Sequence, residues 1–320
     1  MATPPSVIVF GPTGGVASTA VQVALTAGAR VTLAMRDPAK PLPASLANHP
    51  SGTALPRVKA DLTDPASVRA AVVEAGSPKA AFLYFIFGTP DRMRSTVQEL
   101  RDAGVEYVVF LSTSVLAPGA DLRAVAPAEF VGWHHAGVEI ALEEIFGQDG
   151  YAALRPGYFA SNLLQHKKVV AAAVGKDGDG VVRVPGHEAG LDYVLPEDIG
   201  RVAGQLLVRR EASGPITLLG PELLSLAEGL RLVGKALGKT LVVEDIASDE
   251  DALSYMAENI GLPEAGARYL LAGLRKRAQG VGLPDPKEQE EAAGNILKYG
   301  GQEAGRLQDW LEANHGRFLE

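Results

Sequence analysis

Short apolar runs alternate with longer segments of mixed polarity along the first half of the chain. The apolar runs are nearly uninterrupted, which is typical of parallel strands that helices cover on both faces of a sheet. They predict strands at Ser6–Phe10, Arg30–Met35, Leu55–Ala60, Ala80–Phe87, Tyr107–Ser112 and Tyr151–Arg155. The segments between them predict helices at Ser18–Ala27, Pro65–Ala75, Pro90–Ala103 and Pro127–Phe146. This alternation predicts the α/β class, with a doubly wound parallel Rossmann sheet.

The pattern becomes less regular after about residue 156. A glycine-rich turn and then strands and helices are predicted at Gly175–Gly180, Val181–Val184, Pro196–Arg210, Ile216–Leu219, Ser225–Leu237, Leu241–Glu244 and most of 249–318. We therefore expect a Rossmann domain over residues 1–156 and a smaller mixed α/β lobe over residues 157–320. The lobe is expected to cover the substrate, and some of its strands or helices to return to the Rossmann sheet.

The turn after the first predicted strand carries the pattern G-x-x-G-x-x-A, at Gly11, Gly14 and Ala17. Gly11 permits a sharp turn, Gly14 leaves room for a pyrophosphate, and Ala17 lets the next helix lie close to the strand. The N–H groups that begin this helix would face the phosphates. The order strand, glycine turn, helix thus indicates a dinucleotide site, and the residues assigned to it are Gly11, Thr13, Gly14, Gly15 and Val16.

The end of the second predicted strand indicates which dinucleotide binds. It carries Arg36 and then Asp37. A guanidinium at this position suits the 2′-phosphate of NADP, whereas a carboxylate suits the ribose hydroxyls of NAD and repels that phosphate. Arg36 favours NADP(H) as the cofactor, and Asp37 keeps NAD as the alternative.

The third predicted strand is followed by Asp61 and Leu62. The Asp61 carboxylate is placed to accept a hydrogen bond from the adenine amino group, and Leu62 lies beside it. Asp64 directly precedes Pro65, and this pair predicts an N-cap at the start of a helix.

The fourth and fifth predicted strands complete the expected cofactor site. Ile86 and Phe87 should form an apolar wall for the cofactor at the end of the fourth strand. Ser112 and Thr113 follow the fifth strand, and their hydroxyls either bind the substrate and the nicotinamide ribose or cap their own loop.

Composition narrows the function classes. The chain has 320 residues, 47% of them hydrophobic and 21% charged, as in globular enzymes. Its net charge of −8 argues against nucleic acid or an anionic membrane as a partner. The absence of cysteine excludes disulfides and thiolate chemistry. Neither a spanning apolar run nor a signal-peptide pattern is visible, so a cytoplasmic location is the default expectation.

Together these residues resemble the NmrA-like, isoflavone-reductase-like branch of the atypical short-chain dehydrogenase/reductases. The resemblance rests on matches along most of the chain, at Gly11–Ala17, Met35–Asp37, Asp61–Leu62, Leu111–Ser114, Glu139, Leu154–Phe159 with Asn162, Pro196–Gly200, Leu218–Glu222 and Trp310. It implies a Rossmann domain, NADP as the usual ligand and a small C-terminal lobe over the nicotinamide.

The catalytic positions depart from that family. Between Ser112 and Tyr151 there is no Tyr-x-x-x-Lys pair of the kind that typical short-chain dehydrogenases carry. The reductases of this branch commonly keep a lysine four residues before the helix glutamate, and that spacing from Glu139 falls on His135. An imidazole therefore replaces the usual ammonium.

Three residues are the catalytic candidates. His135 is the first choice for a proton donor or oxyanion partner, because imidazole titrates near neutrality; the alternative is a helix-surface histidine. Ser112 and Tyr158 are the others, and Tyr158 is also expected to contact the cofactor or else to pack. His134 should point about 100° away round the helix, to solvent or to packing. No metal site is expected, because the histidines lack ligand spacing.

Three functions remain open. The first is an NADPH-dependent reductase of a small, mostly apolar ketone, enone or quinone-like natural product. The second is a redox-neutral isomerase, cyclase or dehydratase, which the missing Tyr-x-x-x-Lys pair favours. The third is a non-catalytic regulator that senses NADP. A small-molecule substrate and a monomer or homodimer are expected.

Overall fold

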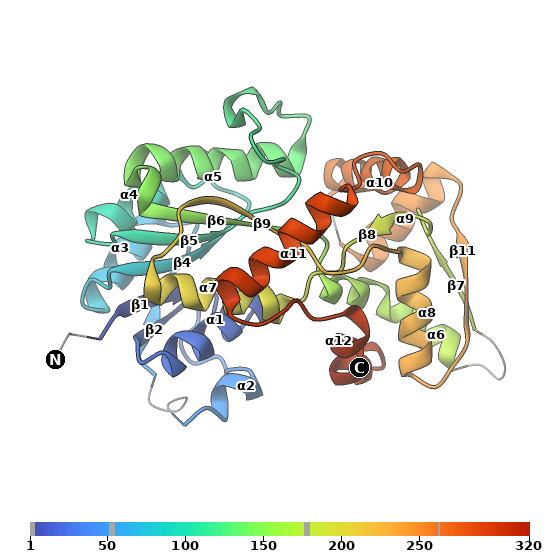
Figure 1. Ribbon diagram of the computed structural model, residues 1–320, viewed down its shortest axis with the longest axis horizontal. Coiled ribbons are helices and arrows are strands. Elements are labelled where there is room, and N and C mark those ends of the chain that lie inside the picture. Colours follow the sequence, from blue (N-terminus) through green and yellow to red (C-terminus); the bar gives the residue numbers. More distant parts are fainter. Residues whose placement is uncertain (1–3, 51–54, 176–179, 262) are drawn as a thin grey trace. The chain divides into compact units, whose positions relative to one another are not determined.

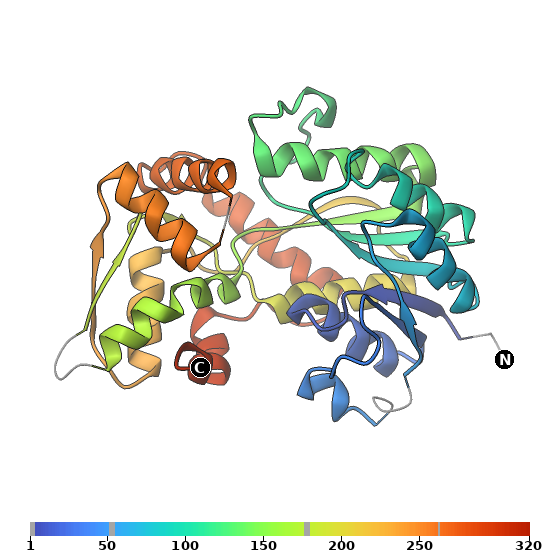
Figure 2. The same cartoon turned by 180° about the vertical axis from the view of Figure 1, so that it is seen from behind.

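The computed structural model describes residues 4–50, 55–175, 180–261 and 263–320 (Figures 1 and 2). Most of the predicted turn at 175–180 lies outside the described residues. The chain divides into two compact units. The first holds the described residues of Met1–Pro156, Pro196–Leu218 and Gly294–Glu303, and the second those of Gly157–Leu195, Leu219–Ala293 and Ala304–Glu320.

The first unit is built on a seven-stranded sheet in the order β3-β2-β1-β4-β5-β6-β9. Each neighbouring pair is parallel, which confirms the predicted doubly wound Rossmann sheet. Its strands are β1 (Ser6–Phe10), β2 (Arg30–Met35), β3 (Arg57–Lys59), β4 (Ala80–Tyr84), β5 (Tyr107–Leu111), β6 (Tyr151–Pro156) and β9 (Gly214–Leu218). Strand β9 comes from the second half of the chain, and by pairing with β6 it covers an edge that would otherwise be open.

Helices cover both faces of this sheet (Figure 1). One face carries α3 (Pro65–Glu74), α4 (Arg94–Asp102) and α5 (Phe130–Phe146), whose apolar residues share a core with Ile8, Leu83 and Phe110 of the strands. The other face carries α1 (Gly15–Thr26) and α7 (Pro196–Arg209), and the short α2 (Ala44–Ala47) follows β2. Continuous apolar strands are thus buried from both sides, as the sequence pattern predicts.

Helices α1 and α7 approach each other through glycine. A Cβ on Gly200 would lie 2.6 Å from the carbonyl oxygen of Val16, and one on Gly204 would lie 2.8 Å from that of Ala20. Real Cβ atoms do not approach backbone so closely, so the two glycines of α7 permit this packing. The contact holds the N-terminal turn of α1, which follows the glycine turn, in place.

Two predicted elements end earlier or begin later than expected. The strand predicted to reach Phe87 ends at Tyr84, the last residue in register with β5. The helix predicted from Pro90 begins at Arg94, because Arg92 (φ +52°) and Met93 (φ +65°) adopt left-handed backbone conformations. The segment between β4 and α4 therefore leaves the sheet as a loop that carries Phe85, Ile86 and Phe87.

The second unit is mixed α/β. Its elements are a 3₁₀ turn (Ala160–His166), α6 (Lys167–Val174), β7 (Gly180–Val184), β8 (Gly190–Leu191), β10 (Leu224–Ser225), α8 (Leu226–Ala236), β11 (Leu241–Asp245), α9 (Asp249–Asn259), α10 (Glu264–Ala278), the first part of α11 (Pro286–Gly300), α12 (Leu307–Asn314) and a 3₁₀ turn (His315–Phe318). Strands β7 and β11 pair in parallel, and β8 and β10 antiparallel. This unit has its own apolar core, in which Tyr193, Trp310 and Phe318 are buried.

Candidate functional site

The glycine turn has the conformation that its sequence predicts. Gly11 has φ +64°, and its N–H donates to the Ala34 carbonyl at 3.0 Å, while the Gly14 N–H donates to the Gly11 carbonyl at 3.1 Å. A Cβ on Gly11 would lie 2.6 Å from Cε1 of Tyr84, the last residue of β4. Only glycine fits at position 11, because its backbone is left-handed and the Tyr84 ring lies against it.

The start of α1 presents unbonded N–H groups. Gly14 is the N-cap and lacks a side chain that could bond to the helix, and the ladder begins with the Ser18 N–H donating to the Gly14 carbonyl at 2.8 Å. The N–H groups of Gly15, Val16 and Ala17 precede that bond, so they and the helix dipole suit an anion. The Val16 side chain is buried, so Val16 can contribute only its backbone N–H.

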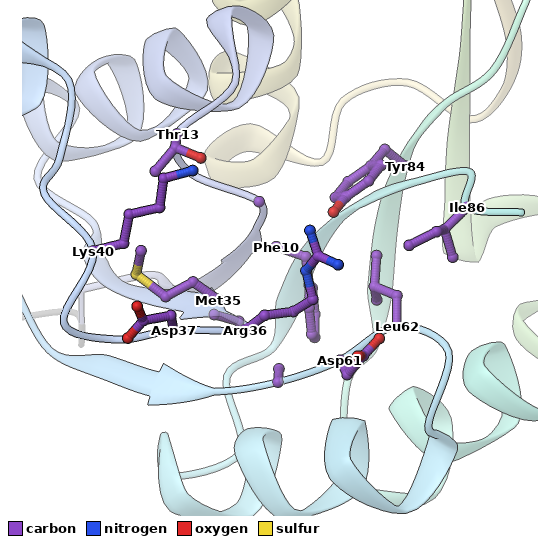
Figure 3. A pocket seen from close by; sticks show the side chains of 13 residues that line it. Phe10, Thr13, Met35, Arg36, Asp37, Lys40, Asp61, Leu62, Tyr84 and Ile86 are labelled. Atoms are coloured by element: carbon purple, nitrogen blue, oxygen red, sulfur yellow. The ribbon is translucent and has the colours of Figure 1, made fainter. Parts of the chain in front are cut away.

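A pocket of about 380 Å³ opens at the carboxyl ends of β1 to β4 (Figure 3). It is lined by Phe10, Gly11, Thr13, Ala34, Met35, Arg36, Asp37, Lys40, Ala60, Asp61, Leu62, Tyr84 and Ile86. Six of the predicted cofactor residues are in this lining: Gly11, Thr13, Arg36, Asp61, Leu62 and Ile86. The structure thus brings the glycine turn together with the ends of the second, third and fourth strands.

Charges of both signs meet in this pocket. Two hydrogen bonds from Thr63, to which the positive charge of Arg36 adds, lower the pKa of Asp61. Burial raises the pKa of Tyr84, and the charge of Arg36 opposes that rise. Figure 3 shows the Arg36 side chain crossing the pocket toward Tyr84. The exposed Arg36 guanidinium is therefore in position to meet an anionic ligand in the pocket.

Asp37, the alternative for NAD, is engaged in its own turn. Its Oδ1 accepts from the Ala39 N–H at 2.9 Å, and its carbonyl accepts from the Lys40 N–H at 3.1 Å. This turn brings the Lys40 side chain to the pocket, a residue that the sequence did not single out. Lys40 lies beyond the end of the strand, where no periodic pattern reports which way a side chain points.

Asp61 likewise supports its own loop. Its Oδ1 accepts from the N–H and the hydroxyl of Thr63, at 2.9 and 2.8 Å, so Oδ2 is the oxygen left for a ligand. Asp64 caps α3 as predicted, because its Oδ1 accepts from the N–H groups of Ala66 and Ser67 at 3.1 and 3.3 Å.

His135 lies on α5 with its ring among aromatic side chains. Its ring centroid is 5.0 Å from that of Phe85 and 5.9 Å from that of Phe110. Nδ1 is buried, without a hydrogen-bond partner among the described residues. Burial, and then the neighbouring His134, lower the pKa of His135 to about 3. The expectation that this imidazole titrates near neutrality is therefore wrong: burial keeps the ring neutral.

Ser112 is buried and bound within the first unit. Its hydroxyl donates to Oε1 of Glu139 at 2.5 Å, and Glu139 forms a bidentate ion pair with Arg155, at 3.0 and 2.7 Å. Arg155 also donates to the carbonyls of Leu116 and Ala117 at 3.0 Å. The geometry favours a positioning role for Ser112 over the expected catalytic one, because its proton is committed to Glu139.

Other residues predicted for the cofactor lie outside the pocket lining. Thr113 caps its own loop, since its hydroxyl accepts from the Val115 N–H at 3.3 Å. Phe87 is 54% exposed, and its ring stacks on Phe130 with centroids 5.5 Å apart. Gly14, Gly15 and Val16 belong to the N-terminus of α1, where the unbonded N–H groups lie.

Tyr158 belongs to the second unit. Its ring packs edge-to-face on Tyr193, with centroids 5.6 Å apart, and its N–H donates to Oδ1 of the buried Asp192 at 3.0 Å. Burial raises the pKa of Tyr158 well above its usual range. A role of Tyr158 toward cofactor or substrate stays a prediction.

Two findings on the described residues bear on other classes of site. These residues contain no group of three or more His, Cys, Asp or Glu side chains placed to hold a metal ion. In the same part of the chain, no helix is both long and apolar enough to cross a membrane.

Several solved structures share the fold. The NADPH complex of the Escherichia coli quinone oxidoreductase QOR2 matches with a TM-score of 0.68 and 17% identity, over 96% of this chain and 99% of that one. The Citrobacter sp. triphenylmethane reductase complexed with NADP(H) matches with a TM-score of 0.69 and 14% identity, over 97% and 99%. The negative transcriptional regulator NmrA matches with a TM-score of 0.65 and 15% identity, over 97% and 95%.

Fewer proteins match by sequence, but they are more similar to this chain in sequence than the structures above. The nitrogen metabolite regulation-like protein bik4 of Gibberella fujikuroi is 33% identical over 331 residues, which cover 98% of each chain. The model of the NmrA-like family matches residues 4–267. The resemblance predicted from the sequence is therefore confirmed, and the chain belongs to the NmrA-like family.

Proposed function

We propose that the pocket at the ends of β1 to β4 binds the adenosine half of NADP(H). The observation that carries this proposal is the meeting of Arg36 with the glycine turn in one pocket. Arg36 and Lys40 supply positive charge for the 2′-phosphate, and the N–H groups of Gly15 to Ala17 supply donors for the pyrophosphate. The Asp37 carboxylate is hydrogen-bonded within its own turn, which supports NADP(H) over NAD as the cofactor.

We further propose that the chain is an NADPH-dependent reductase of a small, mostly apolar ketone, enone or quinone. The cofactor supplies a hydride, a proton follows to oxygen or carbon, and the product gains two hydrogens. The NADPH-dependent quinone oxidoreductase and the dye reductase that share its fold support this reaction class.

Within that reaction His135 would act as a neutral imidazole. A neutral ring donates a hydrogen bond to a carbonyl oxygen from one nitrogen and can stabilise developing negative charge without carrying a positive charge itself. Because its pKa is lowered, His135 is not protonated at neutral pH and is a poor general acid. We assign the proton to solvent, and Ser112 to the positioning of α5 through Glu139.

Turnover tests the proposal directly. Loss of NADPH absorbance is followed with a panel of quinones, enones and aryl ketones, and the product mass is measured. The expected result is NADPH consumption with a product two hydrogens heavier than the substrate. Measurable NADPH binding without turnover of any member would count against a reductase, and a product of unchanged mass would favour the redox-neutral alternative.

A regulator is the second candidate. The observation that favours it is the 33% identical relative, which is named a nitrogen metabolite regulation-like protein, together with the shared fold of the transcriptional regulator NmrA. A regulator that senses cofactor redox state should bind NADP and NADPH with clearly different affinities and consume neither. Equal affinities together with turnover would exclude it.

A further inference from the structure

We infer that Phe85, Phe87, Phe130 and His134, here called the aromatic cluster, form a subsite that stacks the planar aromatic ring of the substrate. The inference rests on the proposed reductase function and narrows its substrate to a ring that carries a carbonyl or hydroxyl oxygen, as in a quinone or an aryl ketone.

The cluster is a set of rings in mutual contact. Phe87 lies nearly parallel to Phe130, at an interplanar angle of 15°, and meets Phe85 edge-on with centroids 4.7 Å apart. His134 touches all three phenylalanines, with centroid distances of 5.3, 5.3 and 4.8 Å, and its Nδ1 is fixed by the Phe130 carbonyl at 2.7 Å. Each ring is therefore held by its neighbours, so the surface is pre-formed.

One ring of the cluster is open to solvent. Phe87 is 54% exposed, whereas every other phenylalanine, tyrosine and tryptophan of the described residues is less exposed. The Phe87 ring stays exposed although the Phe130 ring stacks on it. A phenylalanine left half in water lacks part of the stabilisation that burial would give it, and an apolar ligand that covers the ring would supply that part.

The cluster adjoins the proposed cofactor site. Phe85 and Phe87 flank Ile86, which lines the pocket, on the loop after β4. Ligands of doubly wound sheets bind at these carboxyl ends of the strands. A ring stacked on the cluster would thus lie at the end of the sheet where the cofactor is proposed to bind.

His135 provides the polar group that recognises the oxygen on the substrate ring. The Phe85 ring that touches His134 also lies 5.0 Å from His135, whose buried Nδ1 has no partner among the described residues. A neutral imidazole nitrogen donates to a carbonyl in one tautomer and accepts from a hydroxyl in the other. These are the oxygen groups of a quinone and of its reduced form, so the ligand chemistry fits both ends of the proposed reaction.

Trp133 provides a reporter beside the cluster. Its ring centroid is 5.0 Å from that of His134, and the Arg92 guanidinium lies over it at 4.4 Å while donating to its carbonyl at 3.1 Å. The chain has two tryptophans, and the other, Trp310, is buried in the second unit. In a Trp310→Phe background, tryptophan emission therefore reports on the cluster.

The experiment titrates this background with menadione, a planar quinone, and with 2-cyclohexenone, a non-aromatic enone. Saturable quenching by menadione, about tenfold weaker binding in Phe87→Leu, and retained binding in Phe87→Tyr are expected. Val73→Ala, which changes a side chain of similar exposure (56%) on α3, should bind like the parent. Menadione affinity that is unchanged in Phe87→Leu, quenching that does not saturate, or 2-cyclohexenone binding as tight as that of menadione would overturn the subsite.

His135 is tested with a second probe. His135→Leu should weaken menadione binding at least about fivefold but leave 2-methylnaphthalene, which has the rings without the oxygens, unchanged. Equal loss for both probes would show that His135 only packs, and would overturn its assigned contact. NADPH binding and turnover are measured separately. Ring-dependent menadione binding without turnover of menadione or of any other member of the panel would refute the reductase but not the subsite. Turnover untouched by Phe87→Leu would refute the subsite but not the reductase.

Discussion

The ring of Tyr84 lies against the Cα of Gly11, so closely that a Cβ at Gly11 would stand 2.6 Å from Cε1. The last residue of β4 thereby leaves no room for a side chain at the first glycine of the turn. Two strands that are neighbours in the sheet but far apart in sequence together shape the entrance of the proposed cofactor pocket.

Gly11→Ala is expected to destabilise the fold and to abolish NADPH binding. The left-handed φ of +64° and the contact with Tyr84 would together cost about 1–3 kcal/mol or more. Gly14→Ala is the matched control, because its φ is −79° and a Cβ there would meet only the Gly11 carbonyl, at 3.6 Å. It should fold normally yet bind NADPH weakly, and thermal unfolding with NADPH fluorescence titration separates the two effects. Equal stability of the two variants would contradict this account.

Arg36→Ala should weaken NADPH binding about 10- to 100-fold and NADH binding less than about twofold. A charge-assisted hydrogen bond to the 2′-phosphate contributes about 1.5–3 kcal/mol, and NADH lacks that phosphate. Arg30→Ala, at the opposite end of β2, is the control and should change neither affinity. Parallel loss for both nucleotides would refute the assignment of Arg36 to the 2′-phosphate.

Stability should fall in mild acid because the fold lowers the pKa of two histidines, the partly buried His135 and the buried His166. Burial lowers the pKa of His135 to about 3 and that of His166 to about 4, from the usual 6.5. Below pH 6.5 both histidines are protonated in the unfolded chain but stay neutral in the folded chain. Each histidine therefore lowers the free energy of unfolding by about 1.4 kcal/mol per pH unit, down to its folded pKa.

The measurement is urea unfolding between about pH 7 and pH 4, the range in which these two histidines titrate only in the unfolded chain. His135→Asn should make the loss of stability with falling pH shallower by about one proton. A wild-type slope in His135→Asn would show that His135 is not held neutral by the fold.

Glu139→Gln should destabilise the first unit by about 3–5 kcal/mol, because removing one charge of a buried ion pair leaves the other without its partner. The side chains of Glu139 and Arg155 are 1% and 3% exposed. Arg268→Ala breaks the exposed pair with Glu264 on α10 and should cost no more than about 0.5 kcal/mol. Urea unfolding gives both values. If Glu139→Gln fails to fold, the double variant Glu139→Leu/Arg155→Leu should recover folding, and its failure would argue against the unpaired-charge explanation.

Two glycine-to-alanine changes should have opposite signs. Gly204→Ala places a Cβ 2.6 Å from Val23 Cβ and should cost about 1–3 kcal/mol by overpacking α1 against α7. Gly273 lies inside α10, and a Cβ there would meet no described atom within 4 Å, so Gly273→Ala should stabilise by about 0.5–1 kcal/mol. Thermal unfolding measures the stability of both variants, and a stabilising Gly204→Ala would refute the close contact between α1 and α7.

The parts of the site that the sequence predicts are those set by local chemistry. A glycine turn between strand and helix fixes Gly11 and the start of α1, and the end of a strand fixes Arg36. Asp64 before Pro65 caps its helix for the same local reason. Each of these signals involves residues only a few positions apart, so it can be recognised in a single sequence.

The parts that the sequence misses depend on distant packing. The neutral state of His135 comes from burial beside Phe110 on β5 and Phe85 on the loop after β4, and the bond from Ser112 to Glu139 spans 27 residues. Lys40 reaches the pocket through a turn whose direction no periodicity reports. A residue type states which chemistry is available, but the surrounding fold decides its charge and its partner.

The interleaved order of the two units also constrains how the protein is made. The sheet of the first unit is finished only by β9, and the last pieces of the two units are residues 294–303 and 304–320. A nascent chain that has emerged through Pro156 carries the whole proposed cofactor pocket but leaves α1 without α7 and β6 with an open edge. Helix α1 and strand β6 gain these partners only after residues 196–218 have left the ribosome, so the packing around the pocket forms later in synthesis than the pocket's own strands.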